Sequence, residues 1–270
     1  MLLPPPQAAR AVHIASNAAI ATAFGSPVTE QSLRGSPTLF HRPVGMSRGP
    51  PPVPDSDRNT PAIAKDFFSR LTGPGAIGEG SGVSASETRE VPPFDSVELA
   101  GSNNVVIRVG TEQSVVVHAD DNLLDRVTTE VEDGCLVVDN KNGSFTTRSP
   151  MRVDVTMPAL DALALSGSGS IEADGIDSEA LNVTLSGSGA VNASGTAAGL
   201  DIRLSGSGNA ELQALVARDV RSVVSGSGRI LVTATESIDA SVSGTGAITY
   251  GGDPPQVTTS ITGAGVVTRG

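Results

Sequence analysis

Residues 163–173 read LALSGSGSIEA, and the same phrase returns five times further along the chain. The later copies are VTLSGSGAVNA (183–193), IRLSGSGNAEL (202–212), SVVSGSGRILV (222–232), ASVSGTGAITY (240–250) and TSITGAGVVTR (259–269). The Ser or Thr that opens each motif lies at positions 166, 186, 205, 225, 243 and 262, so the steps are 20, 19, 20, 18 and 19 residues. A fixed period of this length is typical of a solenoid, in which each repeat stacks on the next.

The apolar residues within each copy indicate extended chain. One apolar residue precedes the opening Ser and another follows it by five positions, so the two differ by six, an even number, and share a face of a strand. The position seven after the Ser extends this face through Ala173, Ala193, Leu212 and Val232. β-Branched and small residues dominate here, and helical periodicity is lacking. The sequence therefore predicts an all-β protein with a β-helix, or β-solenoid, of about six coils with 18–20-residue repeats.

The two glycines of each motif are predicted to have a structural role. If the extended alternation continues through S-G-S-G, both point inward, where Gly marks a close backbone approach or a sharp bend. Alternatively, a glycine with positive φ forms a corner. These glycines are Gly167, Gly169, Gly187, Gly189, Gly206, Gly208, Gly226, Gly228, Gly244 and Gly246. The hydroxyl residues between them are then expected outside, stacked in a hydrogen-bonded "hydroxyl ladder" that serves as the candidate partner-binding surface: Ser168, Ser188, Ser207, Ser227 and Thr245.

Residues 89–160 are predicted to form an irregular β region that precedes the repeats at 161–270. Six segments are typical of strands: DSVEL, NVVIRV, SVVVHA, RVTTEV, CLVVD and MRVDVTM. A hairpin is expected through Asp133 and Gly134, and one helical turn at 120–127 capped by Asp120 or Asp121. The segment ELAGSNNVVIRVG is a degenerate copy of the repeat, so this region is expected to form the first coils, with its other strands capping their open edge.

Composition separates residues 1–88 from the domain at 89–270. Fourteen of the 18 prolines lie at or before Pro93, which indicates a disordered Pro/Gly/Ser-rich leader or linker. Residues 11–26 have the apolar character of a signal peptide without its usual order of regions, and residues 62–71 have helical spacing. The net charge is +1 for residues 1–88 and −12 for the rest, which argues against binding nucleic acid or anionic lipid through charge. No stretch approaches the roughly 18 apolar residues of a membrane span.

The repeats do not contain a known catalytic or ligand motif, so no catalytic, cofactor-binding or metal-binding residue is assigned. A phosphate loop needs a following helix and usually a Lys, but each glycine pair is followed by a strand pattern and no Lys occurs after Lys141. The column six after the Ser offers possible cation ligands only at Glu172, Asn192 and Glu211. Six further acids fall at drifting offsets: Asp174, Asp177, Glu179, Asp201, Asp219 and Asp239. The single cysteine, Cys135, is expected to be a small buried strand residue.

A family resemblance rests on the residues before the repeats and on the repeats themselves. The stretches REVPPFDSVELAGSNNVVIRVG and SVVVHADDNLLDRVTTEVEDGCLVV, followed by repeated LSGSG, resemble the bacterial family called putative auto-transporter adhesin, head GIN domain. The resemblance covers residues 89–270. It implies a β-helix-like fold in an envelope-facing or secreted protein, and it supplies no catalytic residues.

These observations predict a non-enzymatic display or adhesion module, secreted or associated with the cell envelope. Its expected partner is a cell-surface glycan or protein that meets the hydroxyl ladder or the terminal coil, without any cofactor. Two alternatives stay open. One is a scaffold that self-associates coil end to coil end, and the other is a glycan-cleaving β-helix enzyme, which would need a cluster of carboxylates in a groove.

Overall fold

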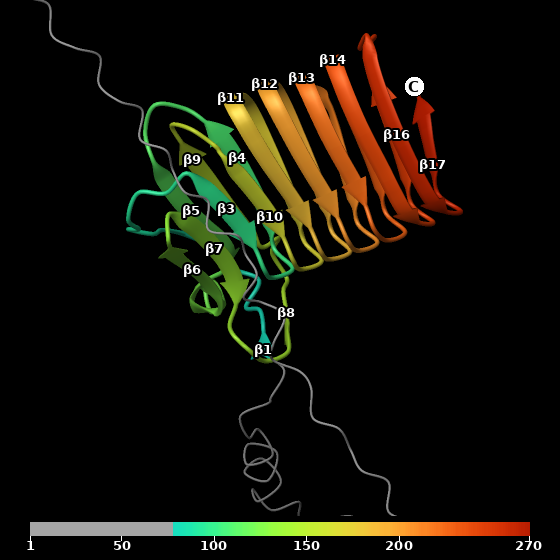
Figure 1. Ribbon diagram of the computed structural model, residues 1–270. Helices are drawn as coiled ribbons and strands as arrows, with labels where there is room; N and C mark the ends of the chain where they lie inside the picture. Colours follow the sequence, from blue (N-terminus) through green and yellow to red (C-terminus); the bar gives the residue numbers. More distant parts are fainter. Residues whose placement is uncertain (1–77) are drawn as a thin grey trace, which may run out of the picture. The chain divides into compact units, whose positions relative to one another are not determined.

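The computed structural model describes residues 78–270, and its elements are 17 strands and one 3₁₀ turn (Figure 1). The predicted all-β class is confirmed. The predictions for residues 1–77, including the segments at 11–26 and 62–71, lie outside the described residues. β structure begins before residue 89, with β1 (Gly78–Glu79) and β2 (Ser84–Thr88), because β1 pairs with β8 (Phe145–Thr146) and β2 pairs with β5 (Ser114–Asp120).

The repeats form a solenoid of parallel strands, as predicted. Its strands are β10 (Ala162–Leu165), β11 (Ser170–Leu185), β12 (Ala190–Leu204), β13 (Asn209–Val224), β14 (Arg229–Gly244), β15 (Ala247–Gly251), β16 (Gln256–Gly263) and β17 (Val266–Arg269). Each pairs in parallel with the coil before and after it, so that Leu165 lies opposite Leu185 and Leu185 opposite Leu204. The solenoid has about five turns, close to the six coils expected.

The degenerate copy before the repeats forms a coil of the same solenoid. β3 (Ser96–Leu99) pairs in parallel with β10, and β4 (Asn104–Val109) pairs in parallel with β11. The corner between them aligns with the first S-G-S-G corner, since the N–H of Ser166 donates to Leu99 O and the N–H of Ser170 donates to Asn103 O. The prediction that this region contributes to the first coils is therefore confirmed.

The core is an aliphatic column inside the coils, at the positions that the sequence indicated. Residues one before and five after the opening Ser are almost completely buried in the first five copies, from Leu165 and Ile171 to Val242 and Ile248. The position seven after the Ser is also buried at Ala173, Ala193, Leu212 and Val232. In the last copy the pattern changes, because Ile261 is 48% exposed and no further coil covers it within the described residues.

The S-G-S-G corners need glycine because the coils approach each other there at backbone distance. A Cβ on Gly187 would lie 1.8 Å from Gly167 O, and one on Gly189 would lie 2.1 Å from Gly169 O. The same two carbonyls accept hydrogen bonds from Ser188 N–H (3.3 Å) and Ala190 N–H (3.1 Å). Of the ten predicted structural glycines only Gly244 has positive φ, so close approach rather than left-handed backbone explains the motif.

The N-terminal end of the solenoid is covered by irregular strands. β6 (Val127–Glu132) and β7 (Cys135–Asn140) form the predicted hairpin, turning through Asp133 (φ 50°) and Gly134 (φ 80°). β7 pairs with β3, and β9 (Arg152–Met157) pairs in parallel with β4 and antiparallel with β5. The expected capping of the first coil by irregular strands is confirmed.

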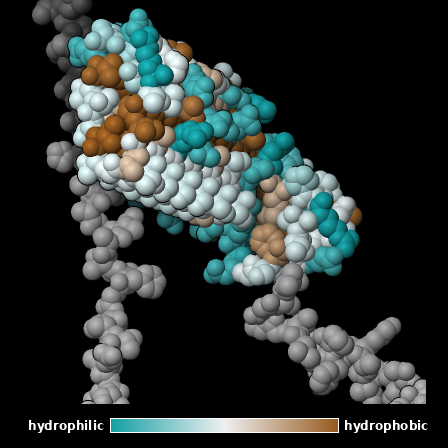
Figure 2. Space-filling model, turned by 90° about the vertical axis from the view of Figure 1, so that its right-hand side faces the viewer, coloured by the Kyte–Doolittle hydropathy of each residue, from teal (hydrophilic) through white to brown (hydrophobic). Residues whose placement is uncertain are grey.

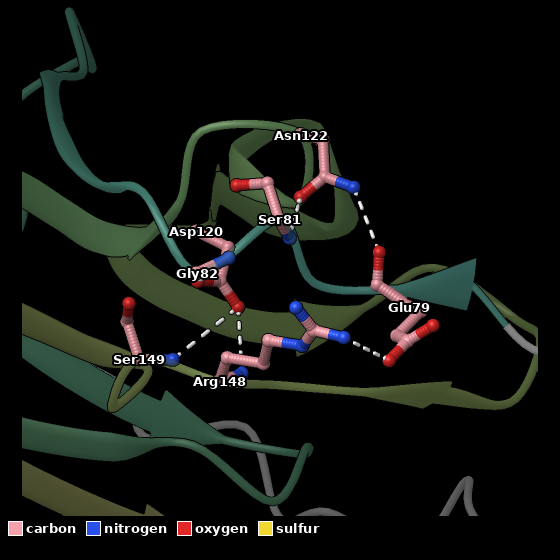
Figure 3. A network of polar contacts seen from close by, with 7 residues as sticks. All are labelled: Glu79, Ser81, Gly82, Asp120, Asn122, Arg148 and Ser149. Atoms are coloured by element: carbon pink, nitrogen blue, oxygen red, sulfur yellow. Dashed lines mark hydrogen bonds and ion pairs between the residues drawn. The ribbon is translucent and has the colours of Figure 1, made fainter.

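Asp120 holds three loops of this cap together (Figure 3). Its carboxylate accepts hydrogen bonds from the backbone N–H groups of Arg148 (2.8 Å), Gly82 (3.0 Å) and Ser149 (3.4 Å). Beside it, Asn122 joins the same loops, because its Oδ1 accepts from Ser81 N–H and its Nδ2 donates to Glu79 O, both at 2.9 Å.

The predicted helical turn is present, but its predicted cap is wrong. The turn is a single 3₁₀ turn, η1 (Leu124–Arg126), whose N-cap residue is Leu123 and which has no side-chain capping bond. Asp120 is engaged by the loops on either side instead, and Asp121 accepts a hydrogen bond from the hydroxyl of Ser81. These long-range N–H donors come from segments 28 and 38 residues away from Asp120, which local sequence does not reveal.

The corner geometry predicts that Gly187→Ala destabilises the domain. The new methyl group would overlap Gly167 O, and overpacking against rigid backbone should lower the free energy of unfolding by about 3 kcal/mol. The neighbouring Ser188→Ala variant is the control, because Ser188 is exposed and should change stability by less than about 0.5 kcal/mol. Chemical denaturation of both variants tests this, and equal stabilities would contradict the close-approach explanation.

The hydrogen bonds accepted by the Asp120 carboxylate predict that the domain loses stability in acid. The N–H of Arg148, with smaller contributions from Ser149 and Gly82, lowers the pKa of this carboxyl below its ordinary value of 3.8. The contribution of the ionised Asp120 carboxylate to the free energy of unfolding is therefore fully present above the unfolded pKa of about 3.9. It is lost as the pH falls through the lower pKa of the folded state. Asp120→Asn should lower Tm at pH 7 and show a smaller further loss between about pH 4 and pH 2 than the parent chain. Asp121→Asn is the control, and identical pH profiles for Asp120→Asn and the parent chain would contradict the role of Asp120.

Candidate functional site

A groove of about 500 Å³ runs across the coils on the outer surface of the solenoid. It crosses the middle of β11, β12, β13 and β14 and reaches the start of β16. Parallel strands lie about 4.8 Å apart, so in-register residues of successive coils form columns along the solenoid axis. Two such columns line the groove. The first is Asn182, Asp201, Arg221, Asp239 and Thr258, and the second is Ala180, Gly199, Asp219, Ser237 and Gln256.

The groove is hollow because the second column begins with small residues and the residues between the columns point inward. Ala180 and Gly199 carry little or no side chain, and Gly199 leaves the space above it open, since a Cβ there would be 3.7 Å from its nearest neighbour. Leu181 and Leu200, which lie between the two columns, are 1% and 2% exposed and belong to the core. A rigid apolar layer therefore supports a polar lining.

The charges of the groove are partly paired. Asp201 forms an ion pair with Arg203 at 3.0 Å, and Asp219 accepts a hydrogen bond from the Ser237 hydroxyl at 2.5 Å. Arg221 lies in register between Asp201 and Asp239 of the adjacent coils, yet within residues 78–270 neither Arg221 nor Asp239 has an ion-pair partner within 4.0 Å. The groove thus offers a guanidinium donor, a carboxylate acceptor and the amides of Asn182 and Gln256 to a ligand.

The structure brings together acids that the sequence spacing appeared to scatter. Asp201, Asp219 and Asp239 drift when counted from the preceding Ser, because the strands contain register shifts, such as that between Leu212 and Val216. Counted back from the following Ser or Thr, the first column is always at −4 and the second always at −6. This constant offset can be read from the sequence alone, and it indicates that these residues form two columns on the same face of the solenoid.

The hydroxyl ladder lies at the corners, away from the groove lining. Ser168, Ser188, Ser207, Ser227 and Thr245 are all exposed, as expected. Within residues 78–270, one hydrogen bond joins two members, from Thr245 Oγ1 to Ser227 Oγ at 3.0 Å. The ladder is therefore a solvent-facing row of hydroxyls whose alignment comes mainly from the glycine backbone beside it, and its role in binding stays a prediction.

The remaining candidates for chemistry are not assembled into a reactive centre. Glu172, Asn192 and Glu211 pair in register and border a smaller hollow of about 280 Å³, but the described residues contain no group of three or more His, Cys, Asp or Glu positioned to hold a metal ion. Cys135 lies on β7, where burial, with a smaller contribution from nearby carboxylates such as Glu98, raises the pKa of its thiol to about 11. The thiol therefore stays protonated at neutral pH and is a poor nucleophile.

The stacked coils and the side-chain columns along them define a parallel β-solenoid domain. Residues 93–254 match the family described as putative auto-transporter adhesin, head GIN domain, and the chain belongs to this family. The family indicated by the sequence resemblance is thus confirmed, and the domain is an adhesion-like module.

Several solved structures are similar to this chain. A putative adhesin from Bacteroides fragilis is 25% identical with a TM-score of 0.61, over 71% of this chain and 99% of that one. A putative lipid binding protein from Parabacteroides distasonis is 21% identical with a TM-score of 0.49, over 72% and 100%. A putative adhesin from the same species is also 21% identical, with a TM-score of 0.48 over 72% and 100%. No curated protein matches the chain.

Across the part of the chain that the structure describes, none of the helical segments has the length and apolar character needed to cross a membrane.

Proposed function

We propose that this protein is a non-enzymatic adhesion module, secreted or held at the cell envelope, and that its groove binds a surface glycan. The observation that carries the proposal is the pair of in-register columns, which places polar donors and acceptors at a repeated spacing of about 4.8 Å. A sugar chain offers hydroxyl groups that both donate and accept hydrogen bonds. An elongated groove on a rigid support suits a ligand that is itself elongated and repetitive.

The charge of the groove favours a neutral or amine-bearing glycan. Its lining carries three carboxylates, of which Asp201 is paired with Arg203 at 3.0 Å and Asp219 with Arg218 at 3.7 Å, so Asp239 is the carboxylate left to attract a cation. The whole chain has a formal net charge of −11, so acidic polysaccharides would be repelled at long range. A neutral sugar meets no such repulsion, and an ammonium group would be attracted to Asp239.

Conservative changes in the groove test this function. Asp239→Asn keeps the size of its side chain and Arg221→Gln shortens it; both side chains lie on the solenoid's outer surface, so both changes should leave stability within about 0.5 kcal/mol. Each hydrogen bond to a charged group contributes about 1.5–3 kcal/mol, so each variant should weaken binding to neutral or amine-bearing envelope polysaccharides by at least about tenfold. The measurement is a glycan array followed by biolayer interferometry of the strongest ligand.

Ladder variants serve as the matched comparison in that experiment. Ser188→Ala and Ser207→Ala remove exposed hydroxyls at the corners and should leave glycan affinity unchanged if the groove is the site. Loss of binding in the ladder variants alone would transfer the site to the hydroxyl ladder. New reducing or unsaturated ends on the bound polysaccharide would contradict the non-enzymatic proposal.

Localisation is a separate test of the same proposal. An antibody raised against residues 78–270 should detect the protein in the medium or on intact cells, and external protease should remove the cell-bound signal. A protein protected inside intact cells would contradict an adhesive role.

A further inference from the structure

The two ends of the solenoid differ in what covers them. At the N-terminal end, the outer edge of β3 pairs with β7 and the outer edge of β4 pairs with β9, and antiparallel β6, β5 and β2 follow. At the other end, β16 and β17 pair with β14 and β15 on one side, and no strand among the described residues pairs with their other side (Figure 1). Within residues 78–270, the C-terminal coil therefore presents an open sheet edge.

This open coil exposes residues that belong to the core pattern. Val257 is 45% exposed and Ile261 is 48% exposed, although each lies in register with a residue of the preceding coil that is 2% exposed, Ile238 and Val242. Figure 2 looks at this side of the molecule and shows apolar patches among paler, near-neutral residues. Natural sheets usually protect such edges with charged residues, Pro or bulges. An uncovered apolar edge of this kind is typical of an interface.

The charge of the open coil favours a second copy as the occupant. Residues 256–270 contain one charged residue, Arg269, and it is paired with Asp253 at 3.0 Å. The chain as a whole carries −11, so two copies would repel each other over most of their surfaces but not here.

β16 is also self-complementary. Alternate residues of each coil direct their N–H groups to the preceding coil, as Ser186 does to Leu165 O at 2.9 Å, and the residues between them face the next coil. By this register, Val257, Thr259 and Ile261 direct their backbone groups to the open side. A two-fold axis through Thr259 would pair β16 antiparallel with itself and place Val257 opposite Ile261 of the other copy, with both apolar side chains toward the joined core.

We propose that the C-terminal coils of two copies associate tail to tail through antiparallel pairing of β16, centred on Thr259, to form a two-fold symmetric dimer. The assembly closes at two, because a two-fold contact uses the same β16 edge of both copies, and the outer edges of β3 and β4 at the other end pair with β7 and β9. An open filament would instead need the C-terminal coil of one copy to stack on the β3 and β4 coil of the next, whose outer edge is already paired. The test residues Val257, Thr259 and Ile261 lie outside the groove lining, although β16 also supplies Gln256 and Thr258 to the end of the groove.

Solution mass and site-specific crosslinking test the dimer with the full chain. Sedimentation equilibrium should give twice the 27.2 kDa chain mass. In a Cys135→Ala background, Thr259→Cys should form a disulfide-linked dimer under mild oxidation, because directly paired antiparallel residues have Cα atoms about 5.5 Å apart, within the range for a disulfide. Thr129→Cys, on β6 at the covered end, is the control and should stay monomeric on a non-reducing gel.

Charge variants test the register itself. Ile261→Glu should weaken the dimer by at least about 100-fold, because it places an unpaired carboxylate against Val257 of the other copy. Combining Val257→Lys with Ile261→Glu should restore the dimer, since the two-fold axis then brings each new ammonium opposite a new carboxylate. Circular dichroism and Tm confirm that each variant is folded.

Each remaining outcome would overturn the proposal. A monomer at the highest soluble concentration would mean that the open coil is not a self-interface, and protection of Val257 and Ile261 in that monomer would assign the surface to residues 1–77. Filaments or larger rings would indicate head-to-tail contacts. A stable dimer that does not crosslink through Thr259→Cys and is insensitive to Ile261→Glu would place the interface elsewhere.

Discussion

The corner carbonyls are the contacts on which the rest of the solenoid depends. Each oxygen of Gly167 or Gly169 lies where the next coil would carry a Cβ, and it accepts the hydrogen bond of an N–H one residue further on. Only glycine satisfies both the distance and the bond. Because this contact repeats at every turn, it sets the coils at one spacing and one rotation. The apolar column, the groove columns and the hydroxyl ladder follow from that alignment.

The core and the surface of such a domain are largely independent of each other. Inside, Leu, Ile, Val and Ala fill the column except at the buried Ser222, which explains how a chain with 3% aromatic residues and no Trp folds at all. Outside, every second residue of a strand is free to vary without disturbing that column. The groove residues Arg221 and Asp239 belong to strands whose inward residues are aliphatic apart from Ser222. The inward residues therefore hold the groove rigid, while the outward residues supply its polar lining.

Sequence reasoning recovered what the repeat dictates and missed what distant segments contribute. The period, the buried columns at Leu165 and Ile171, and the turn at Asp133 and Gly134 are local or periodic, so they could be predicted. The role of Asp120 could not be predicted, because the N–H groups that donate to its carboxylate lie on loops far away in the chain. The groove is an intermediate case: its columns obey a constant offset, but only from the following corner, since the irregular lengths fall earlier in each coil.

The uniform edge that every coil presents also makes the length of the domain adjustable. A coil inserted between β12 and β13 would find the same glycine carbonyls below it and offer the same ones above, while the covered N-terminal end and the open C-terminal end would stay as they are. Duplication or loss of about 19 residues of coding sequence would therefore lengthen or shorten the groove by one step without a new folding problem. Such a domain can therefore evolve by gaining or losing whole coils, which changes the length of the groove before it changes the residues that line the groove.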